Sequence, residues 1–391
     1  MKMFIRVSGN VWRMGISQAL MMTVMNVNLT NTALVGSLLA PVPWLITLPI
    51  SIQFIAVMAA TIPASLLMAR FGRRLIFLIG VLMVTIGAFG QALSILTGSF
   101  TSLVISSFLL GLGQGVAQFY RYAAADSVEG ADKAKAVSFV LLGGLISAII
   151  GPEIAYRTVD LLPNSLYAGC FISIGLVQMI AIPIIWRLDI PPVERKKAKE
   201  RPITEFFLMP SFLSGLIAAA LGYCVMTFLM TATPLQVVDV SRLSHEENAR
   251  VIQWHVVAMF GPSLFSGVLI AKFGVEKILW AGLACYVIAS FLAISGNDFY
   301  IYLGALIFLG IGWNFLYVGG SSIIANSASP EERGRVQGIA DFCIFSAVAA
   351  ASMLSGMAHS EIGWTAMLMC AFVPIFLIVV VLIFGKPKLT I

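Results

Sequence analysis

The sequence has little charge and few of the residues with which soluble enzymes carry out chemistry. Only 11% of its 391 residues are Asp, Glu, Lys or Arg, and it has three histidines and five cysteines. The cysteines lack CxxC spacing, so we expect packing residues rather than disulfides or metal clusters. HExxH, GxSxG and paired acids at metal-binding spacing are also absent. We therefore expect no enzyme and no cofactor.

Apolar residues make up most of the chain. They account for 59% of it, and the mean hydropathy of +0.97 places the protein in a bilayer. Long unbroken runs favour helices over barrel strands, and a span needs about 20 apolar residues. The chain is thus predicted to be an all-α membrane protein with twelve transmembrane helices, at residues 11–38, 44–69, 75–97, 102–124, 136–158, 164–187, 206–233, 250–271, 276–296, 299–325, 334–358 and 362–385.

The basic residues predict the orientation. With both termini in the cytoplasm, only Arg157, Arg242 and Arg250 of the 24 lysines and arginines fall on the outer side. This distribution follows the positive-inside rule. We expect a multi-pass protein of the cell inner (cytoplasmic) membrane with both termini cytoplasmic. The net charge of +6 then belongs to its loops and indicates no nucleic-acid partner.

One long charged stretch divides the chain almost evenly. Residues 187–205 read RLDIPPVERKKAKERPITE. We interpret this stretch as a solvated cytoplasmic linker with weak attraction to anionic lipid. The expected organisation is an N-terminal six-helix bundle at 1–187, a linker at 188–205 and a C-terminal six-helix bundle at 206–391.

Three short motifs recur about 200 residues apart, which indicates a duplicated six-helix unit. The matched pairs are Arg70-Phe71-Gly72 with Lys272-Phe273-Gly274, Gly111-Leu112-Gly113 with Gly310-Ile311-Gly312, and Asp132-Lys133-Ala134-Lys135 with Glu332-Arg333-Gly334-Arg335. In a duplicated membrane protein of this kind, polar residues along the seam between the halves form a site that can open to either side. Candidate functional residues are therefore expected midway along the predicted spans.

Two six-helix halves, a basic central loop and a basic turn after the second span resemble the major facilitator superfamily of secondary transporters. The likeness covers the whole chain. It implies two pseudo-symmetric bundles that rock around a central cavity, giving alternating access, and we expect a monomer. It does not imply a substrate.

The family's loop motif is matched by Arg70, Gly72, Arg73 and Arg74, but Ala69 stands where the family has an acid. We expect Arg70 to pair instead with Asp126 or Glu129, or to act only as a basic anchor at the inner face. Lys272 and Gly274 belong to the matching turn of the second half. The glycine of each turn should allow the chain to reverse direction between helices.

Three titratable groups inside the spans are candidates for proton coupling. Asp341 lies about 12 Å along the eleventh span, too deep for a first-turn contact, and a buried acid there faces a cavity or a partner. A structural hydrogen bond is its alternative role. His255 is a residue type that can titrate near neutral pH, although a lone histidine is more often structural. Glu153 is followed by Arg157 at i+4, so an interfacial ion pair would explain both.

Uncharged amides, hydroxyls and rings occur midway along spans that line the family's cavity. They suit a polar organic ligand, although such residues also join helices to one another. The candidates are Asn28, Asn31, Gln114, Gln118, Tyr223, Thr227, Trp313, Asn314 and Tyr317. Arg121, beside Tyr120 and Tyr122 near the inner end of the fourth span, is either a snorkelling side chain or an anion contact.

We therefore predict a proton-coupled secondary transporter of a small polar or amphipathic organic solute, with Asp341 as the preferred coupling residue. Its expected partners are that solute, protons and membrane lipid. One alternative is a multidrug/proton antiporter, because Gly143, Gly144, Gly151 and Pro152 partly match the family's antiporter motif. Another is a siderophore-type carboxylate importer, suggested by Arg121. A non-transporting receptor is an alternative of another class, disfavoured because the chain has no additional soluble domain.

Overall fold

The computed structural model describes residues 9–129, 132–190, 201–329 and 332–385, apart from the side chains of residues 133, 134 and 334. These ranges contain helices and no strand. The first half comprises α1 (Gly9–Leu39), the 3₁₀ turn η1 (Pro43–Leu45), α2 (Leu48–Phe71), α3 (Arg73–Thr97), α4 (Phe100–Ala117), α5 (Tyr120–Asp126), α6 (Asp132–Arg157), α7 (Ala168–Met179) and α8 (Ala181–Trp186).

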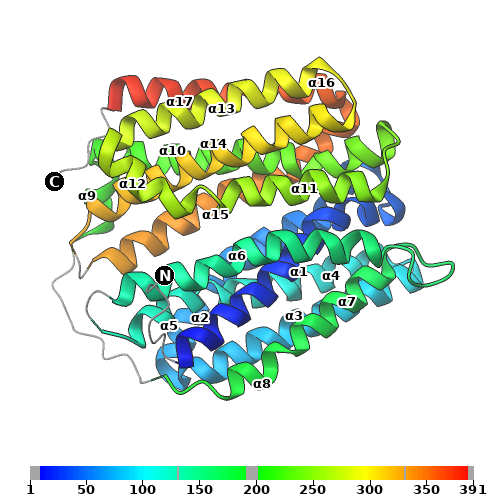
Figure 1. Cartoon of the computed structure of the whole chain (residues 1–391), viewed down its shortest axis with the longest axis horizontal. Helices are drawn as coiled ribbons and strands as arrows, with labels where there is room; N and C mark the ends of the chain where they lie inside the picture. Colours follow the sequence, from blue (N-terminus) through cyan, green and yellow to red (C-terminus); the bar gives the residue numbers. More distant parts are fainter. Residues whose placement is uncertain (1–8, 130–131, 191–200, 330–331, 386–391) are drawn as a thin grey trace, which may run out of the picture. The chain divides into compact units, whose positions relative to one another are not determined.

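The second half begins after the linker and is equally helical (Figure 1). It comprises α9 (Ile203–Phe207), α10 (Pro210–Pro234), the π-helical turn η2 (Leu235–Val240), α11 (His245–Phe260), α12 (Ser263–Phe273), α13 (Val275–Ser295), α14 (Phe299–Asn326), α15 (Arg333–Glu361), α16 (Gly363–Cys370) and α17 (Phe372–Gly385). Most of the linker, residues 191–200, and both chain ends lie outside the described residues.

Each expected span corresponds to one helix or to two consecutive helices. Within the described residues, ten helical segments are long and apolar enough to cross a membrane. The pair α11 and α12, bent by 43° at a short break, makes an eleventh. α1 has 31 residues and occupies the position of the expected first span, but it is not among these segments because its buried side is rich in Asn and Thr.

The chain divides into two compact units. The first comprises residues up to Leu39 together with Ile52–Arg195, and the second comprises Ala40–Ser51 together with the chain from Lys196 onward. The short segment after α1 belongs to the second unit because it bonds to α15. There the Thr47 hydroxyl donates to the Ser352 carbonyl at 3.1 Å, and the Ser51 and Ser352 hydroxyls lie 3.0 Å apart.

In the first unit, α1 and α6 lie side by side (Figure 1). Their close approach depends on small residues of α6, because a Cβ added at Gly143 would meet the Ala19 backbone and one added at Gly151 would meet Asn26. Small side chains of this kind let membrane helices pack closely. Asn26 also donates to the Ser147 hydroxyl at 3.2 Å, so a polar bond joins the same two helices.

The repeated Gly-x-Gly motif makes equivalent contacts in the two units. In the first unit, Gly111 of α4 abuts α2 and Gly113 abuts α3; in the second, Gly310 of α14 abuts α11 and Gly312 abuts α13. At all four positions a Cβ would overlap a neighbouring helix. The motif therefore recurs for a physical reason. In each unit the helix of the fourth span, α4 or α14, packs against the helices of the second and third spans through its two glycines.

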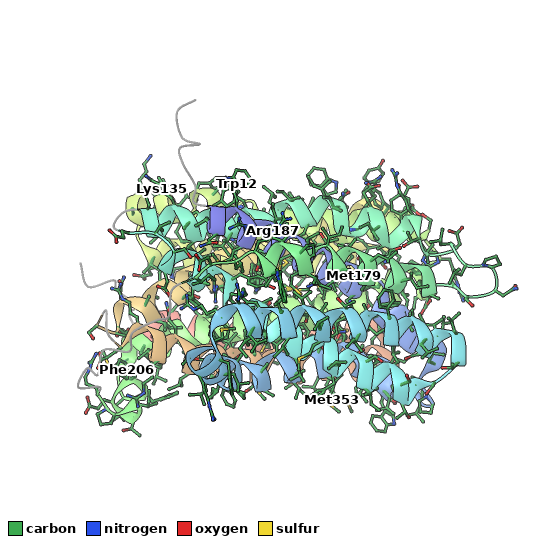
Figure 2. All side chains as sticks on the ribbon, turned by 90° about the horizontal axis from the view of Figure 1, so that it is seen from below. Trp12, Lys135, Met179, Arg187, Phe206 and Met353 are labelled. Carbon is green, nitrogen blue, oxygen red and sulfur yellow. The ribbon has the colours of Figure 1, made fainter. Side chains whose placement is uncertain are left out.

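Large apolar side chains also lie on the outward surfaces of the spans. Met179 of α7 and Met353 of α15, both labelled in Figure 2, are exposed, as are many leucines, isoleucines and phenylalanines of the other helices. Extensive exposed apolar surface marks contact with a membrane or a partner. Together with the span lengths, it fits a multi-pass membrane protein.

Candidate functional site

Aromatic rings gather midway along the helices of the second unit. Trp313 and Tyr317, one turn apart on α14, stack with their centroids 5.0 Å apart and their planes at 9°. Tyr223 of α10 presents its ring edge-on to both, at 5.3 and 5.6 Å. Phe260 lies 5.9 Å from Trp313, and Phe345 lies 6.0 Å from Tyr223. We call these five residues the ring cluster; it brings together three of the predicted cavity residues.

Two polar groups on α10 and α14 accompany the ring cluster without a hydrogen-bond partner in the described part of the chain. Trp313 is 5% exposed and its Nε1–H has no hydrogen-bond partner among the described residues. The same holds for the Oγ1 of Thr227, which is 1% exposed and lies one turn from Tyr223. Buried polar groups are rarely left without partners. These two groups are therefore available to a ligand.

Asp341 lies on α15, the helix that also carries Phe345. Its residue is half-buried rather than fully enclosed. It precedes Phe345 by four residues, so the two side chains lie on the same face of the helix. The acid that was singled out in the eleventh span thus lies near the ring cluster.

Asn314, next to Trp313 in the sequence, is fully occupied by bonds within the second unit. Its Nδ2 donates to the Met259 carbonyl and to the Ser263 hydroxyl, and its Oδ1 accepts from the Ser266 hydroxyl, each at 2.6 Å. Met259 precedes the break between α11 and α12, whereas both serines follow it. These bonds favour the helix-packing role for Asn314, which braces the bent eighth span.

The amides of the first unit form a buried network. Oδ1 of Asn28 accepts from Gln53 Nε2 at 3.1 Å, from Gln91 Nε2 at 3.1 Å and from the Thr32 hydroxyl at 3.0 Å. Its Nδ2 donates to the Val24 carbonyl. Asn28 therefore joins α1, α2 and α3. Gln53 and Gln91 were missing from the predicted residues, although each is a polar residue inside an apolar span.

Asn31 makes a longer bond, donating to the Ala155 carbonyl of α6 at 3.4 Å. Gln114 is buried, and its Nε2 has no partner in the described part of the chain. Gln118 is half-buried and caps the end of α4. Of the four predicted amides of this unit, Gln114 is the one that retains an unsatisfied buried donor.

Arg121 lies on the short helix α5. Its Nη2 donates to the Tyr122 hydroxyl at 3.0 Å, and its guanidinium lies 4.8 Å from the centre of the same ring. Tyr120 points the other way: it is buried and packs edge-on against Phe77 at 4.8 Å. Of the two tyrosines beside Arg121, only Tyr122 accompanies it.

The other two titratable candidates have structural partners. Glu153 Oε2 lies 3.0 Å from Arg157 Nε, which is the expected i, i+4 ion pair. His255 is completely buried between α11 and α14, and its Nδ1 donates to the Leu306 carbonyl at 2.7 Å. The carbonyl can only accept, so Nδ1 carries a proton, and in the neutral imidazole Nε2 carries a lone pair. Within the described chain Nε2 has no partner.

The basic turn after α2 pairs with an acid, but through a different arginine from the expected one. Arg73 Nη2 lies 2.6 Å from Asp126 Oδ2. Arg70 instead lies over the ring of Phe71 at 5.1 Å. The expected Arg70–Asp126 pair is therefore wrong, because Arg73 begins α3 beside the end of α5 while Arg70 still belongs to the last turn of α2.

The two repeated turns have the same backbone conformation. Gly72 has φ +85° and ψ 152°, and Gly274 has φ +86° and ψ 150°. Side-chain-bearing residues rarely adopt this region, which explains glycine at both positions. Lys272 Nζ lies 5.2 Å from the ring centre of Phe273, and in the first turn Arg70 Cζ lies 5.1 Å from the ring centre of Phe71. Arg74 is exposed, as expected of a basic anchor.

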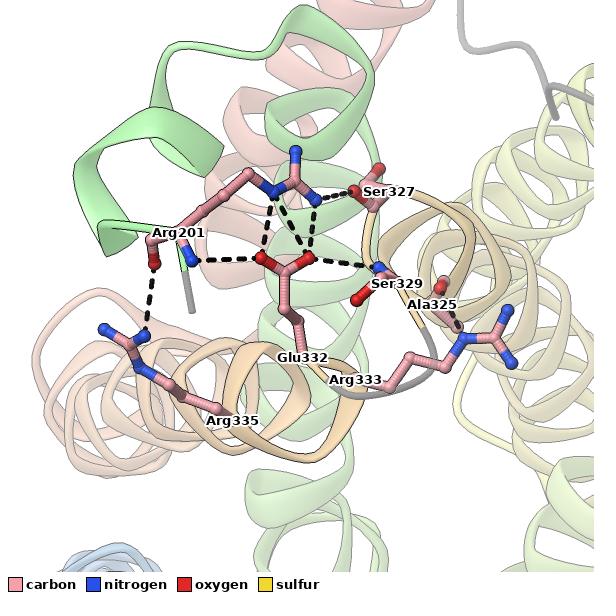
Figure 3. Close-up of polar contacts among 7 residues, drawn as sticks. All are labelled: Arg201, Ala325, Ser327, Ser329, Glu332, Arg333 and Arg335. Carbon is pink, nitrogen blue, oxygen red and sulfur yellow. Dashed lines mark hydrogen bonds and ion pairs between the residues drawn. The ribbon is translucent and has the colours of Figure 1, made fainter. Parts of the chain in front are cut away.

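The end of the linker forms an ion-pair cluster that was not anticipated (Figure 3). Arg201 contacts Glu332 through Nη2 to Oε2 at 2.7 Å and Nε to Oε1 at 2.9 Å, and its backbone N–H donates to Oε1. Arg335 donates to the Arg201 carbonyl at 3.1 Å. The Glu332 side chain is 7% exposed. The interpretation of the linker as wholly solvated is therefore wrong at Arg201.

This cluster controls the ionisation of Glu332. The Arg201 guanidinium, helped by the backbone N–H groups of Arg201 and Ser329, holds the pKa of the Glu332 carboxyl well below its usual range. The same pairing raises the pKa of Arg201. The Glu332 carboxyl is therefore ionised throughout the physiological pH range.

Comparison with known proteins tests the family. The model of the Major Facilitator Superfamily matches residues 14–262 and 249–390. The chain is 36% identical over 384 residues to the riboflavin transporter RfnT of Brucella anthropi, covering 97% of this chain and 96% of that one.

Solved structures test the fold. A D-xylose–proton symporter superposes with a TM-score of 0.77 at 13% identity, covering 97% of both chains. A bacterial homologue of the human lysosomal transporter Spinster, in an inward-facing and unoccupied conformation, superposes with a TM-score of 0.72 at 14% identity, covering 96% of this chain and 94% of that one. The predicted fold is thereby confirmed, and the chain belongs to the Major Facilitator Superfamily, a family of membrane transporters rather than of enzymes.

Proposed function

We propose that this transporter carries a flavin, with riboflavin as the first substrate to test. The ring cluster is the observation that carries the proposal. Trp313, Tyr317 and Tyr223 offer aromatic faces and edges at which a flat heteroaromatic ligand can stack. The 36% identity to a riboflavin transporter along nearly the whole chain supports the same substrate class.

The other predicted cargoes have less support. Asp341 lies one turn from Phe345 of the ring cluster, and an ionised acid repels a carboxylate ligand. This disfavours a siderophore-type carboxylate importer. The residues that suggested a drug antiporter, including Gly143 and Gly151, have a packing role between α1 and α6. They lend no separate support to export.

We further propose that transport is coupled to protons through Asp341. A half-buried carboxyl next to the ring cluster can load a proton while the ligand site is open and release it later in the cycle. Glu153 and His255 are less suited, because the first is paired with Arg157 and the second is held by the Leu306 carbonyl. Alternating access by a monomer completes the proposal.

For location we propose the cytoplasmic membrane with both termini inside. The bacterial origin of the riboflavin transporter supports this membrane. The position of basic residues at the turns, among them Arg73, Arg74 and Lys272, supports this orientation.

Riboflavin uptake by proteoliposomes tests the proposed cargo. Wild-type vesicles should accumulate labelled riboflavin saturably, and Trp313→Ala should raise the KM about tenfold through loss of stacking. Trp280→Ala is the matched control, because Trp280 is an exposed tryptophan of α13 in the same unit. Absence of saturable uptake by wild-type vesicles would reject a flavin cargo.

Proton coupling is tested separately with Asp341→Asn. We expect this variant to lose the accumulation of riboflavin that a pH gradient drives. The exchange of external for internal riboflavin should continue, because exchange leaves the pH gradient unchanged. Undiminished gradient-driven accumulation in this variant would contradict the role of Asp341. The same assay on Glu153→Gln and His255→Gln would then identify the coupling group.

A further inference from the structure

Buried helical threonines of this chain commonly bond back to the carbonyl one turn earlier. Thr30, Thr85 and Thr233 donate from Oγ1 to the carbonyl at i−4, at 2.8, 2.9 and 2.8 Å. Thr227 and Thr231 on α10 do not: both are 1% exposed, and their Oγ1 atoms have no partner among the described residues. Since the i−4 carbonyl is within reach of a helical threonine, these two hydroxyls are turned away from an available bond.

A third unsatisfied donor lies in the neighbouring helix. The Nε1–H of Trp313 on α14 is likewise without a partner in the described chain, and the residue is buried, with only 5% of its surface exposed. By contrast, the buried Trp364 donates its Nε1–H to the Ala293 carbonyl at 3.2 Å. A buried group without a partner is costly. Three such groups on two packed helices need a common explanation.

Their placement connects all three to the ring cluster. Tyr223, Thr227 and Thr231 are spaced at i, i+4 and i+8, so they follow one another along one side of α10. The Tyr223 ring contacts the Trp313 ring. Helices α10 and α14 pack along their length. The donors thus continue from the aromatic surface along the same helix face.

The chemistry of the donors restricts what they can bind. The indole N–H only donates, and a threonine hydroxyl donates readily to an oxygen or nitrogen lone pair. The indole N–H therefore needs an acceptor, and a ligand stacked on the ring cluster would present that acceptor at the edge of its flat ring. Carbonyl oxygens and unprotonated ring nitrogens of a flavin have this arrangement, whereas its polyol tail is flexible and carries no flat face.

We propose that Thr227, Thr231 and Trp313 Nε1 bind the carbonyl and ring-nitrogen edge of the transported flavin, so that this part of the site recognises the ring and not the polyol. This inference rests on the proposed function, which it makes more specific. It assigns substrate selectivity to residues of α10 in addition to the rings of the cluster.

Competition experiments test which part of the substrate is recognised. Lumiflavin, which has the ring system without the polyol, should inhibit riboflavin uptake at a concentration close to the riboflavin KM. Ribitol, which has the polyol without the ring, should not inhibit. Inhibition by ribitol but not by lumiflavin would overturn the inference while leaving riboflavin transport in place.

Variants that each remove one hydrogen-bond donor test the residues themselves. Thr227→Val, Thr231→Val and Trp313→Phe should each raise the riboflavin KM and the inhibitory concentration of lumiflavin about five- to tenfold, the size of one lost hydrogen bond, at unchanged maximal rate. Thr227→Ser, which retains a hydroxyl, should raise the KM less than Thr227→Val does. Thr233→Val is the matched control on the same helix, because its hydroxyl already bonds to Leu229.

The outcomes separate the two levels of the proposal. Uptake is normalised to the amount of protein in the vesicles, so a poorly folding variant is recognised by its low abundance. For such a variant, the competition experiment with wild-type vesicles decides whether the ring is the part of the substrate that is recognised. If wild-type vesicles take up riboflavin but the three variants keep the wild-type KM, only the assignment of the donors is overturned. If wild-type vesicles take up no riboflavin, the proposed function fails with it.

Discussion

Arg201 and Glu332 are joined by a two-pronged ion pair, with Nη2 and Nε of the arginine 2.7 and 2.9 Å from the two carboxylate oxygens. The pair connects the end of the linker to the start of α15, the helix that carries Asp341. Bidentate pairs of this kind are stronger and more directional than contacts with a single nitrogen. The linker is therefore anchored to the second unit where it enters that unit.

Removing either member of this pair should destabilise the second unit. We expect Glu332→Gln and Arg201→Ala each to lower the melting temperature of the detergent-purified protein by about 3 °C. The double variant should lose less than the sum of the single losses, because both remove the same interaction. Scanning fluorimetry of the four proteins measures this. Strictly additive losses would show that the two side chains act independently.

The same pair predicts an acid-sensitive stability. The pKa of Glu332 is depressed in the folded state from its ordinary value of 4.5. Its contribution is therefore complete above that value and is lost progressively as the pH falls towards the folded-state pKa. The difference in melting temperature between wild type and Glu332→Gln should be constant from pH 8 to pH 6 and shrink between pH 5 and pH 3. A difference that grew on acidification would contradict the depressed pKa.

Arg73, rather than Arg70, should matter at the first basic turn. We expect Arg73→Ala to reduce the transport rate several-fold but to change the free energy of unfolding by at most about 1 kcal/mol, since the Asp126 partner is partly exposed. Arg70→Ala removes an equal charge from the same turn and serves as the control. Equal loss of transport in both variants would show that charge alone, and not the pair, is required.

The buried amide network should be more sensitive at its centre than at its edge. Asn28→Ala removes the acceptor of three donors, from Gln53, Gln91 and Thr32, and should destabilise the protein by about 1–3 kcal/mol. Asn31→Ala, which loses one bond of 3.4 Å, should cost clearly less. Unfolding in mixed micelles compares the two. A larger loss in the Asn31 variant would place the centre of the network elsewhere.

The spans were predictable because the membrane imposes a length and a polarity on every helix. The expected runs match the helices, and the repeated turns and Gly-x-Gly motifs occupy equivalent places. The break between α11 and α12 was not anticipated, although Gly261-Pro262 marks it in the sequence. The capping box of α11, in which Ser244 and Glu247 each bond to the other's backbone, likewise had a readable Ser-x-x-Glu pattern.

Side-chain partners were harder to predict because they depend on how helices are rotated against one another. Residues 70 and 73 differ by three positions, yet only one reaches Asp126. Asn28 and Trp313 both looked like cavity residues, but the first has its Oδ1 and Nδ2 bonded within its unit, while the N–H of the second has no partner among the residues that the structure describes. Sequence spacing identifies a helix face; it does not tell which neighbours already satisfy the side chains on that face.

The polarity of α1 has a consequence for how the protein is made. This helix is synthesised before the other described helices, and its buried side carries Asn26, Asn28 and Asn31, so on its own it partitions weakly into lipid. Two of its partners, Ser147 and the Ala155 carbonyl, belong to α6 and are synthesised more than a hundred residues later. We therefore expect the first helix to become stably embedded only when α6 has followed it into the membrane, so that the first unit completes its insertion as a group of helices rather than one helix at a time.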